Sequence, residues 1–69
     1  METTQVVPLY SATAGYREWE TVLDGQHYCI VHEGSSGWTL LRESGGGKWC
    51  DDERTVDEFL TAHNLRLAE

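Results

Sequence analysis

The sequence predicts a small α+β domain, in which an antiparallel meander of three or four strands carries one C-terminal helix on one face. Three observations predict this fold. An Asp24-Gly25 pair separates two segments rich in β-forming residues, a glycine run at 45–47 ends a third such segment, and a capping signal precedes a helical pattern from residue 55. The 69 residues suffice for one domain only, so we assign 1–69 to a single domain.

The first two strands flank the Asp24-Gly25 turn and are expected over residues 17–23 and 26–32. A type I′ turn needs positive φ at both central residues, which Asp and Gly tolerate, so the pair favours a tight hairpin. Along the first strand, Trp19 alternates with Glu18 and Glu20, which is typical of a sheet with one face in water.

The third strand is expected over residues 38–43, before the glycines. Lys48 to Cys50 is then either a short fourth strand or an extended lead into the helix. Trp19 and Trp38 fit core positions on neighbouring elements. Trp49 lies beside the glycine loop, and is either packed like the other two or an exposed interface anchor.

The helix should begin after Thr55, because Thr55 and Glu58 have the spacing of a capping box, in which each side chain accepts a hydrogen bond from the other's backbone. Asn64 fits a left-handed C-cap. Beyond it, Leu65 and Leu67 are expected to pack back on the sheet. The positions with the spacing of one buried helical stripe are Val56, Phe59, Leu60 and His63.

Residues 1–15 are either an edge strand or a flexible N-terminal segment. Pro8 interrupts the stretch from Gln5 to Tyr10, and sheets tolerate proline at their edges. We therefore favour an edge strand there.

Charge is the strongest functional signal in the sequence. Twelve Asp and Glu residues against five Lys and Arg give a formal net charge of −7. This excess argues against direct binding to nucleic acid or to an anionic membrane, and favours a basic protein partner. Acids at a helix start are partly explained by the helix dipole, whereas those of the hairpin are not. The hairpin acids are either a solubility device or a binding surface. The predicted partner-binding residues are Glu18, Glu20, Asp24, Glu33, Glu43, Asp51, Asp52, Glu53, Asp57 and Glu58.

Motifs for catalysis, metals and cofactors are not recognisable. His27, Cys29, His32 and Cys50 are zinc-ligand types, but they form no Cys-x-x-Cys knuckle. The glycines before Lys48 lack the spacing of a phosphate-binding loop, and Trp49 stands where that loop has Ser or Thr. We therefore predict a non-enzymatic protein without metal or cofactor.

The expected compartment is the cytosol. The first ten residues contain neither a basic region nor an apolar run of signal-peptide length, and no apolar stretch reaches membrane-spanning length. In a reducing cytosol, Cys29 and Cys50 are expected to be free thiols rather than a disulfide. We also expect a monomer.

The acidic residues named above, apart from Glu33, carry a resemblance of type across the whole chain. In size, charge and expected β-β-β-α order, the chain resembles small phage-encoded inhibitors of bacterial defence, namely anti-CRISPR proteins of the DNA-mimic type and uracil-DNA glycosylase inhibitors. The resemblance implies a protein of the bacterial host cytosol that binds the basic nucleic-acid surface of a CRISPR surveillance complex, or of another DNA-binding protein, and blocks DNA access. The alternative is a small interaction or regulatory adaptor that uses a sheet edge or a Trp49 patch.

Overall fold

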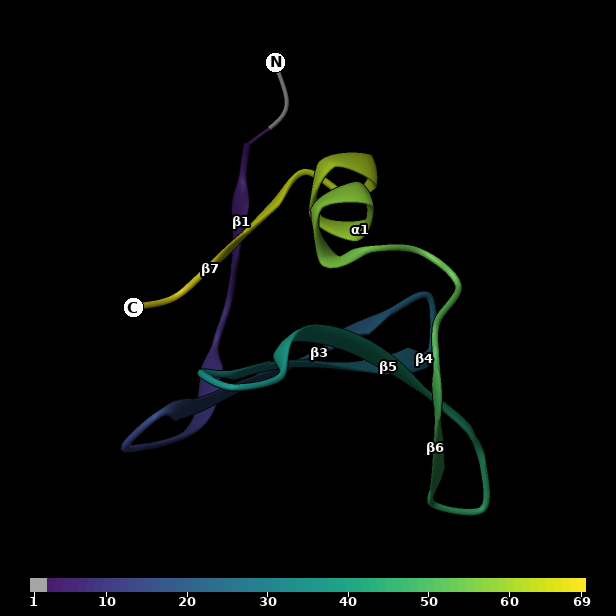
Figure 1. Ribbon diagram of the computed structural model, residues 1–69. Helices are drawn as coiled ribbons and strands as arrows, with labels where there is room; N and C mark the ends of the chain where they lie inside the picture. Colours follow the sequence, from purple (N-terminus) through teal and green to yellow (C-terminus); the bar gives the residue numbers. More distant parts are fainter. Residues whose placement is uncertain (1–2) are drawn as a thin grey trace.

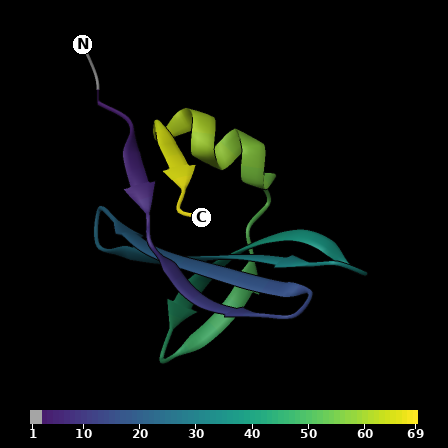
Figure 2. The same cartoon turned by 90° about the vertical axis from the view of Figure 1, so that its left-hand side faces the viewer.

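A five-stranded antiparallel meander forms most of the chain, and one short helix lies over one of its faces (Figure 1). The computed structural model describes residues 3–69. Beside the helix, a pair of short parallel strands joins the two ends of the described chain (Figure 2). The elements in chain order are β1 (Gln5–Val7), β2 (Leu9–Thr13), β3 (Tyr16–Leu23), β4 (Gln26–Glu33), β5 (Gly37–Gly45), β6 (Lys48–Asp51), α1 (Val56–Ala62) and β7 (Leu65–Leu67).

The α+β class is confirmed, but the expected count of three or four strands is wrong, because the meander has five in the order β2-β3-β4-β5-β6. The N-terminal segment supplies β2, and residues 48–51 form β6 rather than an extended lead into the helix. The glycines at 45–47 all have positive φ and let the chain reverse between β5 and β6.

The N-terminal segment forms two strands rather than one, with Pro8 between them. β2 is an edge strand of the meander, as the sequence indicated for part of this segment. β1 instead leaves the meander and pairs in parallel with β7, with Val7 opposite Leu67. Residues 1–2 of the segment lie outside the described residues.

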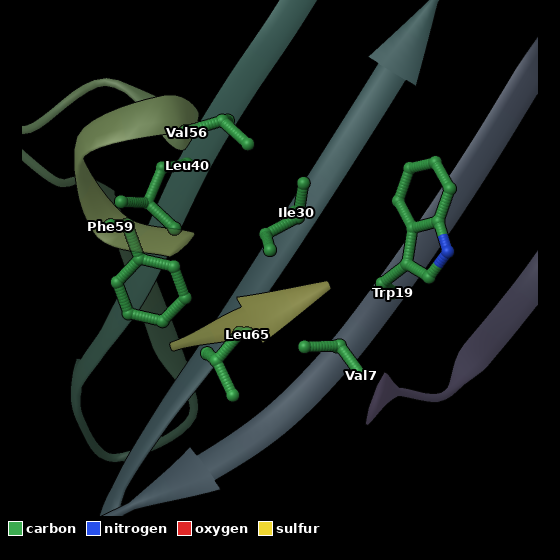
Figure 3. Packing of buried hydrophobic residues seen from close by; sticks show 7 residues of the cluster. All are labelled: Val7, Trp19, Ile30, Leu40, Val56, Phe59 and Leu65. Carbon is green, nitrogen blue, oxygen red and sulfur yellow. The ribbon is translucent and has the colours of Figure 1, made fainter. Parts of the chain in front are cut away.

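The core fills the space between the inner face of the sheet and the layer formed by α1, β1 and β7 (Figure 3). Phe59 and Ile30 are completely buried at its centre. Trp19 is buried at one side, where its indole Nε1 donates a hydrogen bond to the Ala68 carbonyl at 2.8 Å. The buried cluster consists of Val7, Trp19, Ile30, Leu40, Val56, Phe59 and Leu65.

The prediction that Trp38 is a core residue is wrong, because Trp38 is 52% exposed. It stands opposite His32 near the start of β5, and its ring stacks on Trp19 with centroids 5.7 Å apart. Alternation does place it on the inner face with Leu40. Along this face of β5, burial ends at Leu40. Trp38, two residues earlier, lies beyond the part of the sheet that the helix layer covers.

Three local predictions are confirmed. Asp24 and Gly25 have φ values of 51° and 78°, as the tight hairpin turn requires. Asn64 has the expected left-handed φ of 52°, although the C-cap itself is His63 and Asn64 is the residue after it. At the helix start, Thr55 Oγ1 accepts from the Glu58 backbone N–H at 3.1 Å, and Glu58 Oε1 accepts from the Thr55 N–H at 2.9 Å. Side chains therefore satisfy amide donors that the first turn leaves unpaired.

Replacing Thr55 by alanine should lower the free energy of unfolding by about 1 kcal/mol, because the Glu58 amide loses its acceptor. Urea denaturation followed by circular dichroism measures the change. Thr61→Ala is the matched control, since Thr61 is exposed within the same helix. An equal loss of stability in both variants would contradict the capping role of Thr55.

Candidate functional site

The sheet has a second face that no helix or strand of residues 3–69 covers, opposite the helix layer in Figures 1 and 2. Side chains alternate along each strand, and directly paired residues share a face, so the strand register defines this outer face. Glu18 pairs with Val31, and Val31 with Thr39. Glu20 pairs with Cys29, Cys29 with Leu41, and Leu41 with Asp51. The outer face comprises Tyr16, Glu18, Glu20, Val22, His27, Cys29, Val31, Glu33, Thr39, Leu41, Glu43, Trp49 and Asp51.

Half of the predicted acidic residues gather on the outer face: Glu18, Glu20, Glu33, Glu43 and Asp51. Their only ion-pair partner in the described part of the chain is His27, whose Nδ1 lies 3.3 Å from Glu43 Oε1. Arg17 and Arg42 belong to the same strands, but alternation places them on the inner face. The carboxylates of the outer face are therefore not neutralised by lysine or arginine within residues 3–69.

Two titratable groups on the outer face respond to these carboxylates. The Tyr16 hydroxyl donates a 2.6 Å hydrogen bond to Glu18, and this bond, with a smaller effect of burial, raises the pKa of Tyr16 to about 12. Burial of Cys29, with the neighbouring Glu18 and Glu20 adding to it, raises the pKa of its thiol to about 12. Both shifts favour the uncharged form beside negative charge.

Apolar side chains lie among the carboxylates of the outer face. Val22 is 53% exposed and Trp49 is 40% exposed, while Val31 and Leu41 are half-buried. Of the two alternatives left open for Trp49, the structure has the exposed one, and its role as an anchor stays a prediction. Alternation along the first predicted strand already puts Val22 on the face of Glu18 and Glu20. Val31 and Leu41 were not predicted, although an alternation count carried along residues 26–43 would have placed them with the acids.

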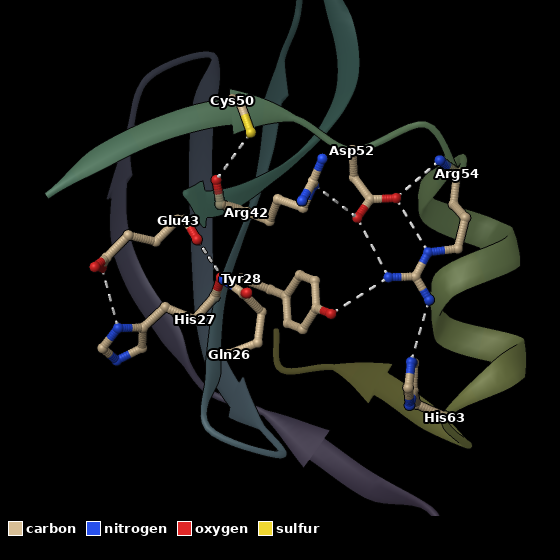
Figure 4. A network of polar contacts seen from close by, with 9 residues as sticks. All are labelled: Gln26, His27, Tyr28, Arg42, Glu43, Cys50, Asp52, Arg54 and His63. Atoms are coloured by element: carbon tan, nitrogen blue, oxygen red, sulfur yellow. Dashed lines mark hydrogen bonds and ion pairs between the residues drawn. The ribbon is translucent and has the colours of Figure 1, made fainter. Parts of the chain in front are cut away.

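The acids near the helix start do not form one surface with the outer face. Asp52 has a side chain only 6% exposed, and its carboxylate binds Arg54 through the backbone N–H at 2.9 Å and through Nε at 3.0 Å (Figure 4). Glu58 closes the capping box. Glu53 and Asp57 are exposed near the helix start, and Asp24 is exposed at the hairpin tip. Asp52 is therefore a structural residue rather than part of an exposed acidic field.

Arg54 connects Asp52 to the helix and the sheet, a role that was not predicted from the sequence. Its guanidinium contacts the Tyr28 hydroxyl at 3.5 Å and His63 Nε2 at 3.3 Å, and it lies over the Phe59 ring. These contacts engage the guanidinium of Arg54. The hydrogen bonds from Arg54 also hold the pKa of Asp52 below its usual range. The sequence signal for this ion pair was an aspartate two residues before an arginine, just ahead of the predicted helix.

The residues of zinc-ligand type do not converge. Cys29 pairs with Leu41 on the outer face, whereas Cys50 pairs with Arg42 on the inner face, and both thiols are free. Within residues 3–69, no three His, Cys, Asp or Glu side chains are arranged to hold a metal ion.

In the same range, the structure contains no helix with the length and apolar character needed to span a membrane. Comparisons with protein-family models, curated proteins and solved structures gave no match.

Asp52→Asn should destabilise the protein at neutral pH, because Arg54 loses its charged partner. The folded-state pKa of Asp52 lies below its ordinary value of 3.8, so its contribution is fully present above that pH and disappears as the pH falls through the folded-state pKa. The difference in unfolding free energy between wild type and variant should therefore shrink in stronger acid. Asp57→Asn, at an exposed position, is the control, and a difference independent of pH would refute the assignment.

Iodoacetamide should alkylate Cys50 and spare Cys29 in the folded protein at mildly alkaline pH. Cys29 is buried with a pKa of about 12 and holds almost no thiolate under these conditions, whereas Cys50 is half-buried. Peptide mass spectrometry identifies the labelled site, and guanidinium should make both thiols react. Equal labelling rates in the folded state would contradict the burial of Cys29.

Proposed function

We propose that the protein is a non-enzymatic inhibitor that binds the basic, nucleic-acid-contacting surface of another protein through its outer face. The observation that carries the proposal is the separation of charge by the sheet, which leaves carboxylates on one face and turns the arginines of the same strands to the other. A surface rich in lysine and arginine is the electrostatic complement of such a face. Such lysine- and arginine-rich surfaces are commonest on proteins that contact the phosphates of nucleic acids.

The apolar members of the outer face add what charge alone does not supply. Long-range attraction raises the rate of encounter, but exposed ion pairs contribute little affinity in salt. Trp49 and Val22 offer apolar area beside the acids, and tryptophan is frequent among residues that dominate binding energy. The proposed complex therefore combines apolar contacts at Val22 and Trp49 with carboxylates directed at lysines and arginines.

Inhibition would then result because this protein occupies the DNA-binding surface of its target. Carboxylates would stand where phosphates otherwise bind, so DNA and this protein would compete for one surface without any chemical step. A CRISPR surveillance complex is the target class we favour, which makes the protein anti-CRISPR-like. A uracil-DNA glycosylase presents the same kind of surface and is the second target class.

The test is a pull-down from bacterial lysate with immobilised protein, followed by elution with duplex DNA. The wild type should retain a nucleic-acid-binding protein that DNA displaces. Retention should weaken as salt rises, because the Debye length falls to about 8 Å at physiological ionic strength. The variant that replaces Glu18, Glu20 and Glu33 with Gln should lose the retained protein.

A control variant removes the same charge elsewhere, through Glu53→Gln, Asp57→Asn and Glu69→Gln, all at exposed positions. It should retain the partner as the wild type does. Equal losses in both variants would show that net charge acts rather than the outer face. Retention that neither DNA nor the outer-face variant disturbs would refute the proposal.

A further inference from the structure

The edge of β5 beside α1 is open over the first part of the strand. β5 pairs with β4 from Gly37 to Arg42, but with β6 only from Leu41 onwards. The last rung on that side is the Asp52 N–H, which donates to the Leu40 carbonyl at 2.9 Å. After it the chain turns away towards the helix, held by the bond from the Arg54 N–H to Asp52 Oδ1.

Ladder geometry shows which backbone groups this departure leaves open. In an antiparallel ladder, the N–H and C=O of one residue point to the same side, and successive residues point to opposite sides. The Leu40 carbonyl points towards β6, so the N–H and C=O of Trp38 point that way as well, where no strand of residues 3–69 lies. Trp38 thus presents one donor and one acceptor in strand geometry.

Natural sheets protect such edges, and the other edges of this sheet are protected. The pairing of β2 contains an irregularity between Leu9 and Ser11, and Pro8 precedes the strand. β6 is short, begins at Lys48, and its pairing shifts register beside Gly45. Lysine, proline and bulges are the usual devices that prevent strand addition. Residues 37–39 of β5 carry none of them.

A groove of about 620 Å³ runs beside this open edge. Such a volume is in the range of clefts that hold a drug-sized ligand, and so is sufficient for a few side chains of a peptide. Arg54 also borders it, but its guanidinium is engaged by Asp52, Tyr28 and His63. The exposed acids on its border are Asp51 and Asp57. Its apolar lining residues are Trp38, Leu40, Val56, Leu60 and Leu67.

We propose that an extended basic peptide segment of a partner protein adds to β5 as a further strand, in the place that β6 leaves at Asp52. The backbone of the peptide pairs with Trp38, alternate apolar side chains enter the groove, and the intervening lysines or arginines point to the outer face beside Asp51. Main-chain pairing supplies affinity and the alternate pockets supply selectivity. The site adjoins the outer face at Asp51. It rests on the open edge of β5 rather than on the outer face, so it does not depend on the function proposed above.

The probe is the capped peptide acetyl-Val-Lys-Val-Lys-Val-amide, titrated into ¹⁵N-labelled full-length protein and followed by NMR. Saturable shifts are expected at the amides of Trp38 and Leu60. The same peptide with N-methyl groups on its valines keeps the charge but loses the ladder donors, so it should bind about tenfold more weakly. Equal binding of both peptides, or shifts confined to Glu20 and Val31, would overturn the proposal.

Two variants at Trp38 isolate the backbone donor. Both lose the indole, but only Trp38→Pro also loses the N–H, and proline is tolerated where that N–H faces outward from an edge. Trp38→Pro should bind the peptide about fivefold more weakly than Trp38→Ala, the value of one hydrogen bond. Equal affinities would contradict pairing at Trp38. If Trp38→Pro does not fold, the N-methylated peptide still decides the question with the wild type.

Discussion

Asp52 joins the sheet to the helix through both its backbone and its side chain. Its N–H forms the last rung to Leu40, and its carboxylate binds Arg54, with Arg42 of β5 at 3.8 Å on the other side. Arg54 in turn reaches Tyr28 and His63, so one ion pair fixes where β6 ends and how α1 lies on the core. A largely buried pair is stabilising only when its remaining hydrogen-bonding groups also find partners, and here Arg54 finds them. Both surfaces proposed for binding depend on this junction. It leaves the edge of β5 open, and it keeps the Asp52 carboxylate away from the acids of the outer face.

Register has the same importance for the outer face. Because side chains alternate with a period of two, a slip of one residue between β3 and β4 would exchange the two faces. Trp19 and Ile30 pair directly and are both buried, so burial of these two residues fixes the register. The same register places Glu18 and Glu20 on the outer face, where both are half-buried. The hydrophobic core therefore determines the arrangement of charge on the opposite side of the sheet, and the acids need no interaction of their own to be placed there.

Local features could be predicted from the sequence, and features that depend on distant contacts could not. The Asp24-Gly25 turn, the Thr55 and Glu58 capping box and the Asn64 cap each depend on neighbours within a few residues, and all three are present. The parallel pairing of β1 with β7 depends on segments at opposite ends of the chain, and nothing local indicates it. Exposure of Trp38 depends on how far the helix layer extends over β5. For the candidate site, composition supplied the acids, but only the register could divide them between the outer face and the helix start.

The parallel strands β1 and β7 also have a consequence for the order in which contacts form. The meander is built from neighbours in sequence, whereas Thr4 and Asn64, hydrogen-bonded at the end of this pair, are 60 positions apart. Closing so long a loop costs more chain entropy than closing a tight hairpin, although the cost rises only with the logarithm of length. Once the meander has formed, the effective loop is shorter, because an ordered sheet replaces most of the flexible chain between β1 and α1. The strand pair should therefore form after the meander, and it then encloses Val7 and Leu65 in the core.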